Sequence, residues 1–314
     1  MIGPQVSVIL PTYNRGHLIK RAIGSVLNQS FIDLELIVVD DGSTEDIEKI
    51  VKSFDDGRIK YIRHEANRGA GAARNTGIKA SCGEYIAFQD SDDEWLPEKL
   101  ERQIEAFKGL GRDAGVVYTD MLRIGEDGKS CYWTSPTVRK GCIVNLETLD
   151  YQAACLGIQS AMIKEVCFDE VGLFDESFPR FIDLELFIRL SKRYEFYHIR
   201  EPLCRYYYTE CISTDINALC IARVLLLRKY FNDIKDDSAF LLAQFTILNE
   251  IQQNERAYIS ALQREITEMR RSIVWHVMMW LDANVICSLL PPGTGRRRSY
   301  ELYLEKARVL LNRK

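Results

Sequence analysis

The chain has 314 residues, a formal net charge of −4 and 46% hydrophobic residues, which indicates a large globular protein with a substantial core. The acidic balance excludes nucleic acid as an expected partner, because nucleic-acid-binding proteins need a basic surface. Nine scattered cysteines form no CxxC pair, which argues against a zinc ribbon. They fit a reducing cytosol, where most would be small buried apolar residues.

The sequence predicts neither export nor membrane insertion. The opening residues, MIGPQVSVILPTYN, are typical of a β-strand and lack the basic and long apolar segments of a signal peptide. No uninterrupted apolar run reaches the roughly 18 residues that a transmembrane helix needs. The nearest approach, residues 272–290, is broken by His276, Asp282 and Asn284. We therefore expect a cytoplasmic protein.

Strands and helices alternate through the first hundred residues. Apolar runs predict strands at 6–11, 34–40, 59–64 and 83–90, with helices between them at about 18–27, 41–54 and 69–81. This alternation predicts an α/β fold whose mostly parallel sheet is covered by helices on both faces. The next segment is mixed, with strands at 115–122 and 195–199 and a helix at 183–194. From about residue 214 the pattern is wholly helical.

Three polar segments follow the first, second and fourth of these strands. They read PTYN, DDGS and DSDD and begin at residues 11, 40 and 90. The carboxyl ends of parallel strands meet at one edge of a sheet, and ligands bind in such folds outside that edge. The sequence therefore predicts a ligand site formed by these three segments.

The acidic segment has two explanations. Asp90, Asp92, Asp93 and Glu94 supply the oxygen ligands that Mg²⁺ or Mn²⁺ favours, and such an ion would neutralise a leaving pyrophosphate. Alternatively, acids at the start of a helix beginning near Trp95 would each stabilise the helix dipole by roughly 0.3–1 kcal/mol. Asp93 and Glu94 fit the helix, whereas Asp90 and Asp92 suit a metal and a diphosphate.

The DDGS and small-residue segments also allow two interpretations. DDGS is either a turn with Ser43 or Thr44 capping a helix, or an acid that hydrogen-bonds a base or ribose. The small residues of NRGAGAARNTG, at 67–77, permit either close approach to phosphates or tight packing of a helix on the sheet. Packing does not account for Arg74, which with Arg68 is suited to phosphate oxygens.

A second acidic pair, Asp183 and Glu185, begins the helix predicted after the turn-rich GLFDESFP segment. A carboxylate there could take the proton of an incoming hydroxyl as a general base. The alternative is that both acids serve only the N-terminus of the helix.

Together, VSVILPTYNR, LELIVVDDGSTEDI, NRGAGAARNTGI, GEYIAFQDSDDEWLPEKLE and FDESFPRFIDLELFIRL resemble the successive motifs of family 2 glycosyltransferases. The resemblance covers about residues 5–215. It implies a GT-A (Rossmann-like) fold: a mixed, mostly parallel sheet flanked by helices, with a helical C-terminal extension. We accordingly expect a catalytic domain at 1–215 and a helical region at 216–314.

The resemblance also implies how a nucleotide sugar, the donor substrate, would bind. Pro11, Thr12 and Tyr13 would line the nucleobase pocket. Asp41 would lie on the base, and Arg74 would lie near the nucleotide.

By the same resemblance, Asp90 would face the ribose or donor sugar and Asp92 would bind Mg²⁺ or Mn²⁺, with Asp93 as a helper. Asp183 corresponds to the catalytic base, although the family's usual Glu-Asp pair is Ile182-Asp183 in this chain. The implied reaction is a single displacement that inverts the anomeric configuration.

The expected acceptor is a glycan or a lipid-linked saccharide, in the assembly of a bacterial surface polysaccharide. The Gln-x-x-Arg-Trp motif and membrane helices of processive family members are missing from the sequence, which favours addition of a single sugar. Two rival functions are a nucleotidyltransferase, which would need a glycine-rich basic loop after the first strand, and a catalytically silent sugar-nucleotide-binding scaffold.

The C-terminal third carries an interfacial pattern. Apolar and aromatic residues at 272–290 are followed by Arg296, Arg297 and Arg298. Such a segment suits peripheral contact with anionic lipid at the inner face of the cytoplasmic membrane. The alternatives are a helical cap on the catalytic domain and a contact between subunits of a homo-oligomer.

Overall fold

The structure is a computed structural model that describes residues 3–145, 150–154, 156–207 and 216–254. The predicted interfacial segment, residues 272–298, lies outside the described residues. The chain divides into two compact units between Ala222 and Arg223.

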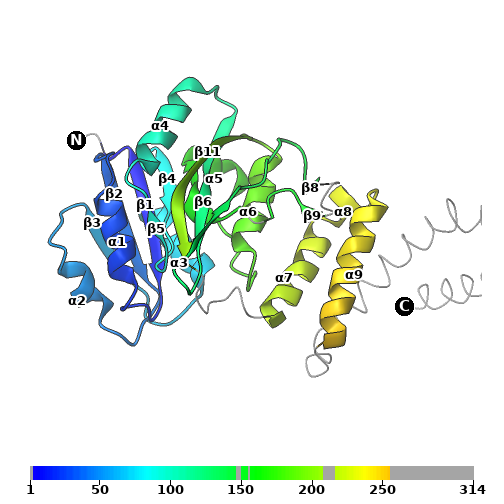
Figure 1. Cartoon of the computed structure of the whole chain (residues 1–314), viewed down its shortest axis with the longest axis horizontal. Coiled ribbons are helices and arrows are strands. Elements are labelled where there is room, and N and C mark those ends of the chain that lie inside the picture. The colour runs from blue at the N-terminus through cyan, green and yellow to red at the C-terminus, as the bar shows by residue number, and fades with distance from the viewer. Residues whose placement is uncertain (1–2, 146–149, 155, 208–215, 255–314) are drawn as a thin grey trace, which may run out of the picture. The chain divides into compact units, whose positions relative to one another are not determined.

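The N-terminal unit is built on one sheet with the strand order β3-β2-β1-β4-β10-β6-β11-β5, and β7 pairs with β6 (Figure 1). Its strands are β1 (Val6–Thr12), β2 (Leu34–Asp40), β3 (Ile59–Arg63), β4 (Tyr85–Phe88), β5 (Glu94–Trp95), β6 (Ala114–Ile124), β7 (Ser130–Trp133), β10 (Ala161–Lys164) and β11 (Glu195–Tyr207). The strands β1 to β4 pair with one another in parallel, and β6 pairs with β11 in parallel. In contrast, β10 is antiparallel to both β4 and β6. This mixed sheet confirms the predicted fold class. Two further short strands, β8 (Val144–Asn145) and β9 (Asp150–Tyr151), form a separate pair.

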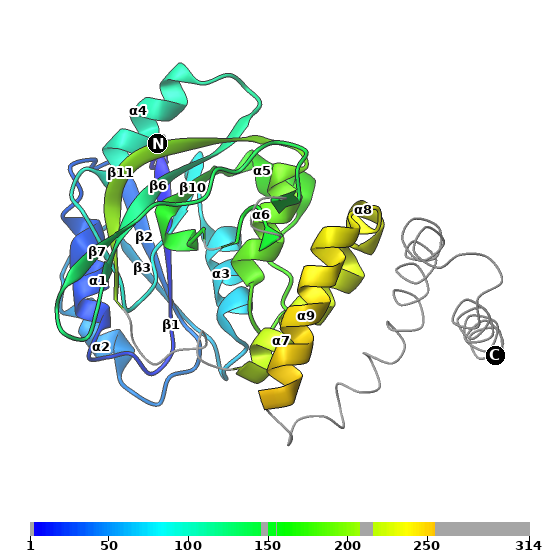
Figure 2. The ribbon, with the colours of Figure 1, turned by 45° about the vertical axis from the view of Figure 1, so that its right-hand side comes forward.

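Helices cover both faces of the sheet, as predicted (Figures 1 and 2). They are α1 (Ile19–Leu27), α2 (Ile47–Lys52), α3 (Ala70–Ala80), α4 (Lys99–Gly109), α5 (Val166–Val171) and α6 (Ile182–Ser191), with a short 3₁₀ turn at Ile158–Ser160. Apolar side chains of α1, α2 and α4 share one core cluster with β1 and β2, while α3 packs on the opposite face.

The small residues of α3 do serve close packing. A Cβ on Gly77 would lie only 2.4 Å from Cγ2 of Ile9, so the helix sits directly on β1. A Cβ on Gly71 would lie 3.9 Å from Cγ2 of Ile182, which brings α3 close to the start of α6 (Figure 2). The helix therefore packs on β1 near its C-terminal end and approaches the start of α6 near its N-terminal end.

The helix predicted to begin near Trp95 is present, but its predicted start is wrong. Glu94 and Trp95 form β5, which pairs with Cys204 and Arg205 of β11, and α4 begins only at Lys99. The indole of Trp95 is buried and donates to the carbonyl of Gln159 at 3.0 Å, so it belongs to the core rather than to a helix start.

Helices α7 (Ile216–Lys229), α8 (Phe231–Ile234) and α9 (Ser238–Asn254) confirm the predicted helical pattern as far as residue 254. Within the C-terminal unit, Arg223 donates to the side chain of Gln244 at 2.5 Å. No helix among the described residues is both long and apolar enough to cross a bilayer.

Candidate active site

The carboxyl ends of β1, β2 and β4 meet at one edge, as the sequence predicted. The register pairs Thr12 with Asp40, and the amide of Asp41 donates to the carbonyl of Thr12 at 2.8 Å. The amide of Gln89 donates to the carbonyl of Ile9 at 2.9 Å, which places the acidic segment beside the same strand.

The PTYN segment presents its three candidate residues unequally. Pro11 and Thr12 are buried in β1, whereas Tyr13 is 43% exposed. The hydroxyl of Thr12 is buried and has no hydrogen-bond partner. Among these residues, only the Tyr13 ring offers an aromatic surface on which a base could stack.

The two aspartates of DDGS have separate tasks. Asp40 is fully buried and accepts from the Ser43 amide at 2.9 Å and the Tyr61 hydroxyl at 2.7 Å, which makes it the turn residue. The cap of α2 is Asp46, which accepts from the Lys49 amide at 3.0 Å, so the predicted caps Ser43 and Thr44 are wrong.

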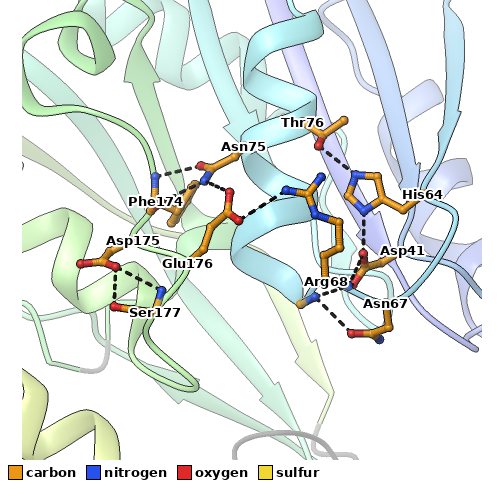
Figure 3. Close-up of polar contacts among 11 residues, drawn as sticks. Asp41, His64, Asn67, Arg68, Asn75, Thr76, Phe174, Asp175, Glu176 and Ser177 are labelled. Carbon is orange, nitrogen blue, oxygen red and sulfur yellow. Dashed lines mark hydrogen bonds and ion pairs between the residues drawn. The ribbon is translucent and has the colours of Figure 1, made fainter.

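Asp41 contacts the small-residue segment that leads into α3. Its carboxylate accepts from the amides of Arg68 and Gly69 at 3.0 and 2.7 Å, and it contacts Nδ1 of His64 at 2.6 Å (Figure 3). The side chain is almost completely buried. In this structure Asp41 therefore fixes the backbone of the segment 67–69, which leads into α3.

Arg74 links helix α3 to the acidic segment. Its guanidinium is buried and donates to Oδ1 of Asp90 at 2.7 Å, with its carbon 5.7 Å from the centre of the Phe174 ring. Desolvation raises the pKa of Asp183, while the positive charge of Arg74 opposes that rise and the negative charge of Asp90 adds to it. The structure thus brings Arg74, Asp90 and Asp183 within electrostatic reach of one another.

Asp183 lies in the first turn of α6, where the preceding Phe181 has a left-handed backbone with φ of 60°. One carboxylate oxygen of Asp183 accepts from the amide of Leu184 at 2.9 Å. Glu185 instead is fully buried and forms an ion pair with Arg189 at 2.7 Å. Of the two acids in this turn, Glu185 has a structural partner on its own helix.

The acidic segment divides between two environments. Asp92 lies 3.7 Å from the guanidinium of Arg15 and is partly exposed. Asp93 is buried and accepts from the amide of Tyr207 at 3.0 Å, while its second oxygen has no partner. Burial, together with the charges of Asp90 and Asp92, raises the pKa of Asp93 well above its ordinary value.

The predicted role of Asp93 and Glu94 at a helix start is therefore replaced by contacts with β11. Glu94 accepts from Arg205 at 3.1 Å and from the hydroxyl of Tyr207 at 2.9 Å. Both acids hold the end of β11 against the acidic segment.

The sequence did not indicate any part for Arg21 or Tyr207 at this edge of the sheet. Arg21 extends from α1, donates to the carbonyl of Asp92, and stacks over the Tyr207 ring at 3.6 Å. A basic residue on the polar side of an amphipathic helix gives no sign of such a contact, because its partners are distant in the sequence.

The chain matches the family model described as glycosyl transferase family 2 over residues 7–168. It is 32% identical over 224 residues to the uncharacterized glycosyltransferase RP339 of Rickettsia prowazekii, and the match covers 69% of each chain. The chain belongs to glycosyltransferase family 2. It is a glycosyltransferase, as its motifs predicted.

Two further comparisons extend this result. The UDP-Glc:α-D-GlcNAc-diphosphoundecaprenol β-1,3-glucosyltransferase WfgD of Escherichia coli is 48% identical over 99 residues, 32% of this chain and 39% of that protein. The crystal structure of S. aureus TarS 1–349 in complex with UDP matches with a TM-score of 0.66 and 20% identity, covering 97% of this chain and 87% of that one. At this identity the structural likeness shows the fold.

Proposed function

We propose that the protein is an inverting, metal-dependent glycosyltransferase that moves one sugar from a nucleotide-sugar donor to an acceptor hydroxyl. The observation that carries this proposal is the grouping of Arg74 and Asp183 with Asp90 of the acidic segment at the carboxyl edge. It joins a cation suited to phosphate, carboxylates suited to a metal or sugar, and a carboxylate suited to a proton.

The residues at this edge fit a divalent cation that the donor helps to bind. No group of three or more His, Cys, Asp or Glu residues able to hold a metal occurs in the described part of the chain. Mg²⁺ is often held by only one or two carboxylates together with substrate phosphates, and Asp92 with Asp90 would supply the protein's share. The unpartnered, buried oxygen of Asp93 and the crowding of like charges favour a cation nearby. Such an ion would stabilise the charge of the leaving nucleoside diphosphate.

Asp183 would take the proton from the acceptor hydroxyl. The acceptor oxygen then bonds to the anomeric carbon as the bond from that carbon to the diphosphate oxygen breaks, and the configuration inverts. Arg74 would lie on the donor side, near the nucleotide. Its charge keeps Asp183 from being protonated too readily, because it opposes the effect of burial on the pKa of Asp183.

The relatives support a sugar nucleotide and a bacterial surface polysaccharide. The name of WfgD specifies UDP-Glc and a diphosphoundecaprenol-linked acceptor. TuaG of Bacillus subtilis, described as a putative teichuronic acid biosynthesis glycosyltransferase, is 39% identical over 127 residues. We therefore propose a lipid-linked or growing glycan acceptor at the cytoplasmic face of the membrane.

The first test is transfer from a panel of UDP, GDP and dTDP sugars to diphosphoundecaprenol-linked saccharides, with Mn²⁺ or Mg²⁺. We expect turnover that EDTA abolishes and either metal restores. Replacing the base in Asp183→Asn should lower kcat about 10²–10⁴-fold, as loss of a general base does. Near-normal turnover of this variant would remove Asp183 from the role, and a product with retained configuration would exclude the single displacement.

A further inference from the structure

His64 is a buried residue that the proposed reaction does not use. It directly follows β3, and its amide donates to the carbonyl of Asp40 at 2.8 Å. The residue is 8% exposed, and its ring contacts two other elements through its two nitrogens. Nδ1 lies 2.6 Å from Oδ1 of Asp41, and Nε2 lies 2.8 Å from the hydroxyl of Thr76 on α3 (Figure 3).

The partners of His64 determine its hydrogen positions. The Asp41 carboxylate can only accept, so Nδ1 must carry a hydrogen and donate it. Nε2 can then accept from the Thr76 hydroxyl when the ring is neutral, or donate to it when the ring is charged. The ring therefore keeps both partners in either state, and its orientation between the end of β2 and α3 is fixed.

Asp41 transmits this orientation to the segment that precedes α3. The Asp41 oxygens accept from the consecutive amides of Arg68 and Gly69, and Gly69 has a φ of +91° that L side chains rarely adopt. The neighbouring Gly42 approaches the same segment closely, since a Cβ on it would lie 2.7 Å from the carbonyl carbon of Ala66. Such a compact arrangement depends on the direction in which the Asp41 carboxylate points.

The same segment is tied on its other side to the turn before α6. Arg68 lies 3.5 Å from Glu176, and Glu176 accepts from the side chain of Asn75 at 2.9 Å (Figure 3). Both Arg68 and Glu176 are substantially exposed, so this contact is weak on its own. The buried His64–Asp41 contact is thus the firmer of the two attachments.

We propose that His64 is a positioning residue of the donor site. It orients the Asp41 carboxylate and thereby fixes the segment 67–69, against which the nucleoside end of the donor binds. This inference rests on the proposed function, because it takes the ligand of this segment to be a nucleotide. His64 itself takes part in no bond-making step. Its loss should weaken nucleotide binding while the chemistry at Asp183 is retained.

The test compares His64→Leu with His64→Asn in the full chain. Leucine removes both hydrogen bonds, whereas the asparagine amide can still donate to Asp41 from near the position of Nδ1. UDP, GDP and dTDP are titrated by calorimetry in the presence of Mn²⁺, and the nucleotide that binds the wild type most tightly is used for all variants. We expect His64→Leu to raise Kd about tenfold or more, and His64→Asn to stay within about threefold of wild type.

His198→Leu is a matched control for general loss of stability. His198 also contacts an aspartate, at 2.7 Å from Asp120 in a part-buried position, but it belongs to β11, separated from β2 in the sheet by several strands. We expect this control to lower the free energy of unfolding without changing Kd. Should His64→Leu fail to fold, Thr76→Val removes only the Nε2 partner and should raise Kd by a smaller factor, about threefold.

The outcomes separate the inference from the proposed function. A wild-type Kd in His64→Leu, or an equal rise in Kd in His198→Leu at equal loss of stability, overturns the positioning role alone. If His64→Leu does not fold, an unchanged Kd in Thr76→Val has the same consequence. If the wild type binds none of the three nucleotides, the proposed function falls and this inference falls with it.

Discussion

Asp183 is held between opposing influences on its pKa. Burial and the charge of Asp90 favour its protonated form, whereas the charge of Arg74 and the Leu184 amide favour the carboxylate. A general base must be deprotonated to act, so activity should fall as the pH is lowered through the pKa of Asp183. Because that pKa is raised, the acidic limb of kcat/KM should lie above the ordinary range of an aspartate.

Removing the positive charge in Arg74→Met should move this acidic limb to higher pH. Without Arg74 the carboxylate loses a positive charge that stabilises it, so its pKa rises further and protonation begins at a higher pH. The measurement is a pH profile of kcat/KM for the wild type, Arg74→Met and Arg74→Lys. Lysine keeps the charge, so its profile should stay nearer that of the wild type. Identical limbs in all three proteins would disprove the electrostatic coupling.

The sequence predicted which residues lie at the site better than it predicted what each of them contacts. Asp90, Asp92 and Asp183 could be selected because their motifs follow strand ends or a helix start. The division of labour between Asp40 and Asp41 could not, because it depends on which carboxylate faces the turn and which faces residues 67–69. Contacts that join residues about a hundred positions apart, such as Asp93 with Tyr207, leave no local pattern to detect.

Among the elements, helix α1 has a structural relation to the acidic segment that its sequence does not reveal. Arg21 donates to the carbonyl of Asp92. Gln29, which lies just beyond the end of the helix, donates to the carbonyl of Leu96 at 2.8 Å and accepts from the amide of Leu100 at 3.0 Å. The helix therefore fixes the acidic segment, and the residue that follows it fixes the chain that leads into α4. Its apolar periodicity predicts burial of one face but says nothing of these polar contacts.

The substitution Arg21→Met should weaken the metal-dependent part of nucleotide binding. It removes the contact that holds the backbone of Asp92 and the cation that stacks on Tyr207. We expect Kd for UDP measured with Mn²⁺ to rise about tenfold, with little change in its absence. Lys20→Met, at an exposed neighbouring position on α1, serves as the control. A similar rise with and without Mn²⁺ would mean that Arg21 acts on the nucleotide pocket as a whole.

The start of α4 contains a buried lysine with consequences for stability. Lys99 has no exposed surface, donates to the side chain of Gln103 at 2.9 Å and lies 3.9 Å from the Trp95 ring centre. Burial lowers its pKa to about 8. Because the folded pKa lies below the unfolded value, the protein loses stability as the pH falls from about 10.5 to about 8, by up to about 3 kcal/mol. Stacking on Trp95 favours the charged form and offsets part of this loss.

The substitution Lys99→Met should remove that pH dependence. Urea unfolding of the wild type and the variant at pH 7 and pH 10 gives the change in their stability difference, in which other titrating groups cancel. We expect the free energy of unfolding of the wild type, relative to that of the variant, to be about 1–3 kcal/mol higher at pH 10 than at pH 7. Lys52→Met, at an exposed lysine paired with Glu48, should show almost no such change. A pH-independent difference for Lys99→Met would show that the pKa of Lys99 is the same in the folded and the unfolded protein, so that its burial has no effect on protonation.

The strand order was only partly predictable, because some strands are defined by partners distant in the sequence. Long apolar runs predicted β1 to β4 and β6. β5 is only two residues long and is defined by its pairing with β11, while β10 inserts antiparallel between β4 and β6. Neither feature has a local signature, since each depends on partners distant in the sequence.

Over the whole molecule, the family match covers part of the N-terminal unit and leaves the C-terminal third outside it. The family match at residues 7–168 falls within the N-terminal unit, where ordered motifs converge on one edge. Residues 272–298 combine apolar residues with Arg296, Arg297 and Arg298, and their interfacial role stays a prediction from sequence. A lipid-linked acceptor would give that role a purpose, because the enzyme must reach a sugar at the membrane surface.

The interfacial role predicts a specific dependence on charge. Each basic residue near an anionic surface contributes about 1 kcal/mol, so replacing all three arginines by glutamine should weaken binding roughly 100-fold. Co-sedimentation of the full chain with phosphatidylserine-containing vesicles at low and high salt measures this, with pure phosphatidylcholine vesicles as the control. Salt should release the wild type, because it screens charges over about 10 Å at 0.1 M. Equal sedimentation of the wild type and the triple variant, or none of either, would leave a subunit contact or a helical cap as the role of these residues.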